Sequence, residues 1–141
     1  MKSKYIILLF ALSSLTACGQ QKNTDKKSKI IEKNITMDTS KLTNETVKKA
    51  FEALQAGDKI WYTFFTENPI MTDDGNKVDF KNFFAKALGT EKFLTIDKVE
   101  NDGNDIYGNF KAGQWGTFPV FFKFHQNAEG KFDRLDIGQG K

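Results

Sequence analysis

The sequence predicts one α+β domain in which a layer of helices packs against an antiparallel sheet. Apolar residues recur at helical spacing between residues 43 and 88, and from residue 92 onward they alternate with polar residues, as in strands. About 100 residues follow position 41, which is enough for a single core, and 13 of the 14 phenylalanines lie among them. The switch in periodicity inside one stretch of chain therefore predicts the fold class.

The domain is expected to begin with two helices. The first covers residues 43–56, and Gly57 stands where a C-terminal cap belongs. Asp58 is a cap for a short second helix over 58–66, and Pro69 ends it. The first helix has an apolar stripe at positions i, i+3, i+4 and i+7, formed by Val47, Ala50, Phe51 and Leu54.

A short strand and a third helix come next. The strand is predicted over 69–72, and the following DDGNK at 73–77 is typical of a turn. Asp79 begins the third helix and Gly89 ends it. Its apolar stripe has the same spacing as that of the first helix and consists of Phe80, Phe83, Phe84 and Ala87.

The rest of the chain predicts four antiparallel strands, at 92–100, 105–112, 117–126 and 131–138. Hairpin turns are expected at 101–104 and 127–130, and a glycine-flanked connection at 113–116. The side chains expected to face the helices are Val120, Phe122, Phe124, Leu135 and Ile137. Lys123, His125, Arg134 and Asp136 are expected on the outer face, where they can form cross-strand charge pairs. Phe121 and Phe132 are expected on the same face.

The first residues predict export. Lys2 and Lys4 precede the apolar run 5–12, which is too short to cross a bilayer, so a cleaved signal is expected rather than a membrane span. The string LTAC at 15–18 resembles the lipobox of bacterial lipoproteins. The resemblance implies cleavage before Cys18 and acylation (diacylglycerol, palmitate) of its thiol, which anchors the protein to membrane lipid. The alternative is an ordinary signal peptide with a chance cysteine.

Three segments result: a signal peptide at 1–17, the lipidated cysteine with a flexible polar tether at 18–41, and the folded domain at 42–141. The predicted location is the cell envelope, on the outer face of a single membrane. Gly19 is not the aspartate that resembles an inner-membrane retention signal, so the outer membrane is favoured in a cell with two membranes.

Charge and composition exclude several classes of function. Residues 42–141 hold 13 basic and 15 acidic residues, a net charge of −2, whereas a nucleic-acid-binding domain normally has a basic face. The domain has no cysteine, and His125 is the only histidine, so disulfides, thiolate metal sites and multi-histidine zinc sites are not expected. No motif for a nucleophile or a cofactor occurs. We therefore expect no metal, no cofactor and no nucleic-acid partner.

Three strings together resemble the nuclear transport factor 2-like superfamily, in its SnoaL-like and ketosteroid-isomerase-like branch. They are AFEALQAGDKIWYTFFTENPIMTDDG, VDFKNFFAKAL and VFFKFHQNAEGKFDRLDIG, in the element order α-α-β-α-β-β-β-β. The resemblance implies a conical, strongly curved antiparallel sheet wrapped around the N-terminal helices, and a cavity for a small molecule. It also implies that dimers through the outer sheet face are common.

The isomerase branch allows a comparison residue by residue. The position of its general base falls on Asp73, with Asp74 beside it. The positions of its two oxyanion-stabilising acids fall on Ala50 and Phe122, which have no donor, and losing one such donor costs about 3 kcal/mol. Asp73 is therefore the candidate catalytic residue, and steroid-type isomerisation is not expected.

Three functions stay open at this point. The first is a non-catalytic lipoprotein domain that binds a small apolar ligand or an envelope protein. The second is a small cofactor-independent enzyme of the isomerase or dehydratase type with Asp73 as general base. The third is a structural module for dimerisation whose core is filled. Besides Asp73, the candidate cavity residues are Tyr62, Trp61, Phe51, Phe122, Phe124, Trp115 and Leu135.

Overall fold

The computed structural model describes residues 37–140, so Cys18, the signal peptide and most of the predicted tether lie outside the described residues. The domain is a compact unit with its own core, and Met37 already packs against that core. Within residues 37–140, no helix is long and apolar enough to cross a membrane. The elements are α2 (Glu45–Ala56), η1 (Lys59–Phe64), β1 (Phe65–Asp73), β2 (Asn76–Val78), α3 (Phe80–Ala87), β3 (Lys92–Phe93), β4 (Lys98–Glu100), β5 (Asp105–Lys111), η2 (Gly113–Trp115), β6 (Thr117–Gln126) and β7 (Phe132–Gln139).

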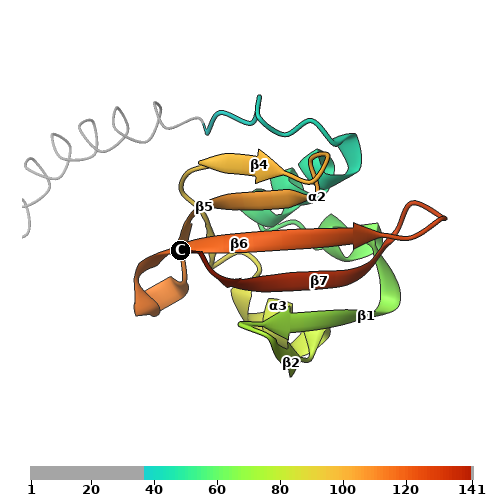
Figure 1. Cartoon of the computed structure of the whole chain (residues 1–141). Helices are drawn as coiled ribbons and strands as arrows, with labels where there is room; N and C mark the ends of the chain where they lie inside the picture. Colours follow the sequence, from blue (N-terminus) through green and yellow to red (C-terminus); the bar gives the residue numbers. More distant parts are fainter. Residues whose placement is uncertain (1–36, 141) are drawn as a thin grey trace, which may run out of the picture. The chain divides into compact units, whose positions relative to one another are not determined.

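The strands form one curved, open sheet with the order β2-β1-β7-β6-β5-β3, and β4 also pairs with β5 (Figure 1). The predicted antiparallel order of the later strands is confirmed. The first strand is longer than predicted, continues into the β1–β2 hairpin, and joins β7 in parallel, so the sheet is mixed. Strands β1, β5 and β7 therefore end at the same edge of the sheet, where β6 begins.

Caps position the helices; those at Gly57, Asp58 and Asp79 were predicted, and the cap at Asn44 was not. The Asn44 side chain accepts hydrogen bonds from two backbone N–H groups of the first turn of α2, and Gly57 ends that helix in the left-handed region at φ 66°. Asp79 caps α3 in the same way. The second helix is a 3₁₀-helix, η1, whose cap is Asp58. It passes directly into β1, because Phe65 already has an extended backbone.

The predicted strand 92–100 consists of two strands, β3 and β4. The backbone N–H groups of Leu94 and Thr95 both donate to the carbonyl of Asn109, which interrupts the pairing with β5. The backbone of Thr95 also lies so close to Gly108 that a Cβ there would come within 2.0 Å of its carbonyl oxygen. Only a glycine fits at position 108, and the strand bends at that point.

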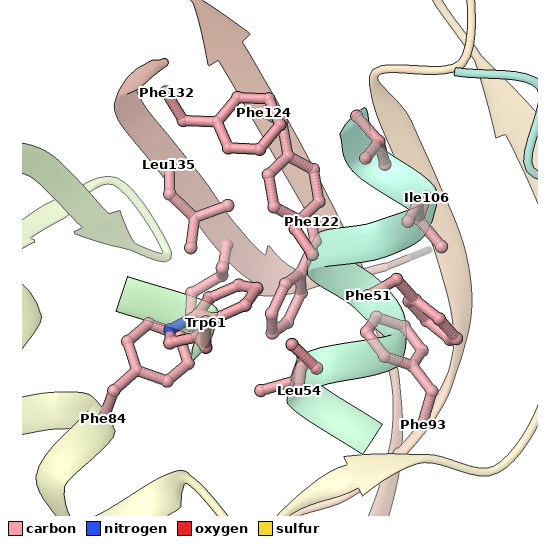
Figure 2. Close-up of a cluster of buried hydrophobic side chains, with 14 of the residues drawn as sticks. Phe51, Leu54, Trp61, Phe84, Phe93, Ile106, Phe122, Phe124, Phe132 and Leu135 are labelled. Atoms are coloured by element: carbon pink, nitrogen blue, oxygen red, sulfur yellow. The ribbon is translucent and has the colours of Figure 1, made fainter. Parts of the chain in front are cut away.

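An aromatic core fills the space between α2 and the concave face of the sheet (Figure 2). Phe51 of α2 contacts Phe93 of β3, with ring centroids 5.2 Å apart. Trp61 lies between Phe65 and Phe84, at 4.7 and 4.9 Å. The largest fully buried side chains are Trp61, Phe51, Phe84, Phe93, Phe122, Phe132, Leu54, Met71, Ile106, Leu135 and Val47.

Phe132 is the clearest error of the strand prediction. It was expected on the outer face with Phe121, but it is fully buried and contacts Phe124 at 5.0 Å. Between β6 and β7 the register shifts, so that His125 faces Arg134 whereas Gln126 faces Phe132. The extra residue between them, Asp133, reverses the side-chain alternation and turns Phe132 inward.

Of the four residues predicted to pair on the outer face, His125 and Asp136 pair across the strands, and Arg134 pairs with Asp136 within β7. Asp136 accepts hydrogen bonds from Arg134 at 2.9 Å and from Thr72 of β1 at 2.6 Å, and it contacts His125 Nε2 at 2.8 Å. Partial burial alone raises the pKa of Asp136, but the hydrogen bonds from Arg134, Thr72 and His125 outweigh it, so the pKa lies below the ordinary value. The network joins β1, β7 and β6 on this face.

Candidate functional site

A pocket of about 320 Å³ opens at the edge where β1, β5 and β7 end. Its volume is at the lower end of the range of small-molecule sites, about 300–1,000 Å³. The aromatic core closes its floor, since Phe122 belongs to both. The residues that line it are Asp73, Asp74, Phe83, Glu91, Phe110, Ala112, Trp115, Phe118, Val120, Phe122, Ile137, Gly138 and Gln139.

Strand β1 places Asp73 at the pocket. Met71 points into the core and is fully buried, and the alternation of side chains puts Asp73 on the same face two residues later. Asp74 has a positive φ of 49° and begins the hairpin turn. Its carboxylate accepts a hydrogen bond from the backbone N–H of Gln139 at 2.8 Å. The two neighbouring carboxylates are therefore not equivalent: Asp74 has a protein partner, and Asp73 has none among residues 37–140.

The third carboxylate of the pocket, Glu91, was not among the sequence candidates. It lies in the connection from α3 to β3, and its backbone N–H donates to the carbonyl of Ala87. The end of this connection is fixed from α2, because the Gln55 side chain donates to the Phe93 carbonyl at 2.9 Å and accepts from the Phe93 N–H at 2.8 Å. Gln55 therefore pairs with β3 as a neighbouring strand would.

A contact between two glycines fixes the start of the same connection. A Cβ on Gly57, at the end of α2, would come within 2.7 Å of the Gly89 Cα at the end of α3. Both residues have positive φ, 66° and 86°. Glu91 follows Gly89 by two residues, so its backbone is located relative to α2 on both sides.

Burial and like charge act on both carboxylates in the same direction. Burial raises the pKa of Asp73, and the negative charge of Asp74 raises it further. Burial also raises the pKa of Glu91, and the negative charge of Asp73 adds to it. No side-chain hydrogen bond to Asp73 or Glu91 comes from the described part of the chain. Each carboxyl group is therefore stabilised by taking up a proton or by a ligand that donates a hydrogen bond to it.

The remaining walls are apolar, and one indole stands at the rim. Phe110, Phe118 and Phe122 come from β5 and β6, and Ile137 of β7 lies beside Phe122 as its cross-strand neighbour. Trp115 in η2 has 77% of its surface exposed. The pocket thus combines an aromatic wall with two carboxylates that have no protein partner.

The predicted site residues separate into two groups. Asp73, Trp115 and Phe122 line the pocket, where their binding role stays a prediction. The other five do not line it: Tyr62 packs edge-on against Phe80 at 6.1 Å, whereas Trp61, Phe51, Phe124 and Leu135 are buried in the core.

Two details explain this division. The Trp61 Nε1–H has no hydrogen-bond partner and is surrounded by rings, which indicates a packing residue and not a polar contact for a ligand. The positions that correspond to the isomerase acids are a buried alanine, Ala50, and the pocket wall residue Phe122. Among residues 37–140, no group of three or more histidine, cysteine or carboxylate side chains is arranged to hold a metal.

No family model matches the sequence, and no curated protein matches it either. Solved structures do match: an NTF2-like protein of unknown function from Cytophaga hutchinsonii is similar over 74% of this chain and 95% of its own, with 16% identity and a TM-score of 0.56. The chain has the nuclear transport factor 2-like fold. Identity this low establishes the NTF2-like fold alone.

Two other structures show how differently the NTF2-like fold is used. The orange carotenoid protein of Anabaena (Nostoc) sp. PCC 7120, solved binding canthaxanthin, matches 73% of this chain but only 37% of its own length, with 19% identity and a TM-score of 0.53. AclR, a putative hydroxylase from Streptomyces galilaeus, matches 67% of this chain and 86% of its own, with 8% identity and a TM-score of 0.51. The function of this chain has to be argued from its own pocket.

Proposed function

We propose that the domain binds a small molecule with an apolar body and a hydrogen-bond-donating end, such as an amine, in the pocket at the end of β1, β5 and β7. The observation that carries the proposal is the pair Asp73 and Glu91, which have no protein partner and lie against aromatic walls. A partly buried carboxylate without a donor is costly, and a ligand that supplies the donor removes that cost.

The filled core limits the size of the ligand. The space between α2 and the sheet is occupied by side chains such as Phe51, Phe84 and Phe124, so a ligand has only the space at the open end, about 320 Å³. A molecule with one ring and a short polar arm fits this volume, whereas a steroid-sized skeleton needs more of the interior. A filled core also agrees with the structural-module alternative, which the ligand experiment therefore has to test.

We further propose that Cys18 is acylated and holds the domain at the cell envelope. The LTAC string and the preceding charged and apolar segments support this anchor. In a cell with two membranes, Gly19 favours the outer one. The test is a Cys18→Ser substitution followed by membrane fractionation: the variant should leave the membrane fraction and lose acyl labelling, and its retention there would contradict acylation.

The ligand class is tested by thermal shift with benzylamine and phenethylamine, against the alcohols and carboxylic acids of the same skeleton. At a concentration tenfold above Kd, a bound amine should stabilise the domain by about 1.4 kcal/mol, which corresponds to roughly 6–11 °C in Tm. The acids should give no shift, because a further negative group would enter a pocket already lined by the carboxyl groups of Asp73, Asp74 and Glu91. The double variant Asp73→Asn, Glu91→Gln should lose the preference for amines.

A matched control is Asp97→Asn, which removes an exposed carboxylate in the β3–β4 connection, outside the pocket. This variant should keep the response to amines. Equal shifts with acids and amines would contradict the role of the two carboxylates. No shift with any member of the panel, together with a dimer in native mass spectrometry, would favour the structural module.

The raised pKa values favour acid–base catalysis as a second candidate function. Asp73 is the candidate base and Glu91 the candidate acid or hydrogen-bond donor, and the raised pKa of both carboxyl groups supports this pair. Removal of a proton next to a carbonyl can be followed as deuterium exchange of ring ketones by NMR. Asp73→Asn should abolish the exchange and Asp74→Asn should retain it. The absence of exchange in the unmodified protein would contradict this catalytic function.

A further inference from the structure

The connection η2 presents an indole to solvent. Trp115 is 77% exposed, whereas the other exposed large apolar side chains among residues 37–140, Ile60, Ile70 and Leu94, are 42–49% exposed. The loop has positive φ values at Gly113 and Gly116, 53° and 104°, which hold it in a compact turn away from the sheet. Exposing an aromatic ring of this size to water is unfavourable, and a contact that removes it from water is therefore stabilising.

Exposed lysines flank this indole. Lys111, at the end of β5, faces Lys92 of β3 directly across the strand pair, and the η2 connection begins two residues after Lys111. Lys86 of α3 lines a groove that Trp115 also lines. The lysines are exposed, whereas two of the acidic residues at this end, Asp73 and Glu91, are half-buried in the pocket, and Asp74 accepts from the backbone of Gln139. Asp79 caps α3.

The chain enters the domain at the same end. Met37 contacts Gln55, whose side chain is bonded to Phe93 of β3. Phe93 in turn pairs with Phe110, a wall residue of the pocket. The chain that leads from Cys18 to Met37 therefore reaches the domain beside the strand pair that bears Lys92 and Lys111.

We propose that this end of the domain docks on a lipid bilayer. Trp115 inserts at the level of the headgroups, and Lys86, Lys92 and Lys111 lie against anionic lipid phosphates. Tryptophan suits this position because its ring is apolar and its N–H finds a partner at the interface. The pocket, which Trp115 borders, then opens toward the membrane. The docking adds a second contact to the anchor proposed at Cys18 but does not depend on it.

The experiment uses residues 37–141, the compact unit with its own core, so that neither the signal peptide, the acyl chains nor the lysines before residue 37 contribute. The domain is mixed with vesicles of phosphatidylcholine and phosphatidylglycerol in equal parts, and with vesicles of phosphatidylcholine alone. The chain has two tryptophans. Trp61 is fully buried, so a change in emission on binding reports Trp115.

On the mixed vesicles we expect a blue shift of the emission, quenching by bromine-labelled lipid, and co-sedimentation that falls as salt rises. Trp115→Ser should weaken partitioning about tenfold, and Lys92→Glu with Lys111→Glu by a similar factor or more. Ile60→Ser removes another exposed apolar side chain, in η1, and should leave partitioning unchanged.

Two results would overturn the proposal. One is the absence of partitioning into either kind of vesicle, with Trp115 emission unchanged, which would leave the indole as a contact for a protein or a ligand. The other is binding that Trp115→Ser does not alter. Fractionation of the Cys18→Ser protein tests the anchor separately, so a failed anchor and a failed docking surface are distinguishable.

Discussion

The pairing of Gln55 with Phe93 allows a stability prediction of known size. Gln55→Leu keeps a side chain of similar volume but removes two hydrogen bonds, of 2.8 and 2.9 Å, to the backbone of β3. Each such bond contributes about 0.5–1.5 kcal/mol net, so the pair contributes about 1–3 kcal/mol. Strand β3 has only two residues, and the Phe93 N–H and carbonyl lose these partners. We therefore expect the free energy of unfolding to fall by about 2 kcal/mol.

Urea denaturation followed by circular dichroism measures this change, with unfolding in water obtained by linear extrapolation. A loss of about 2 kcal/mol also corresponds to a Tm lower by roughly 8–16 °C for a domain of this size. The matched control is Gln126→Leu, which removes one exposed hydrogen bond, to the Gly130 carbonyl, and should cost less than about 1 kcal/mol. A loss of unfolding free energy below about 0.5 kcal/mol for Gln55→Leu would refute the interpretation that the Gln55 side chain pairs with β3 as a neighbouring strand would.

Three further predictions concern titration and packing. Asp73→Asn and Glu91→Gln should each raise the free energy of unfolding at pH 7, by less than about 1 kcal/mol after solvent screening, because the raised pKa values mean that ionisation favours the unfolded chain. This extra stability should develop as pH rises above the ordinary carboxyl pKa and disappear in acid. Extra stability that persists in acid would contradict the raised pKa values. The pKa of Asp136 is lowered, so its stabilisation should be present at neutral pH and lost as pH falls through and below 3.8, and Asp136→Asn should abolish this part of the acid dependence in urea titrations. Phe132→Ala should lower the free energy of unfolding by about 3–5 kcal/mol, and Phe121→Ala, on the outer face, should lower it clearly less. Equal losses of unfolding free energy in denaturant titrations would show that the bulge at Asp133 is wrongly placed.

The sequence was sufficient for features that depend on local chemistry. The predicted caps Asp58 and Asp79 and the terminator Gly57 have short-range causes, so these helix limits follow from the chain itself. The first helix begins at Glu45, after its cap Asn44, and not at residue 43. The inner face of β6 and the outer charge pairs also follow from strict alternation.

Features that depend on long-range pairing were not predictable. The parallel pairing of β1 with β7 joins residues more than sixty positions apart, and nothing local in β1 indicates it. The bulge at Asp133 inverts Phe132 without any glycine or proline to mark it. For the site, Asp73 was found through the resemblance to the isomerase branch, whereas Glu91 becomes a pocket residue only when the sheet brings the α3–β3 connection opposite β1.

The close contact of Gly57 with Gly89 has a consequence for how the pocket responds to a ligand. Two helix ends that meet backbone to backbone, with no side chain between them, cannot slide or rotate past each other without a collision of main-chain atoms. The spacing between Asp73 and Glu91 is thus fixed before any ligand binds. A ligand should therefore bind to a pre-formed pocket, so that little entropy is lost in ordering the protein and the shape of the pocket sets the selectivity.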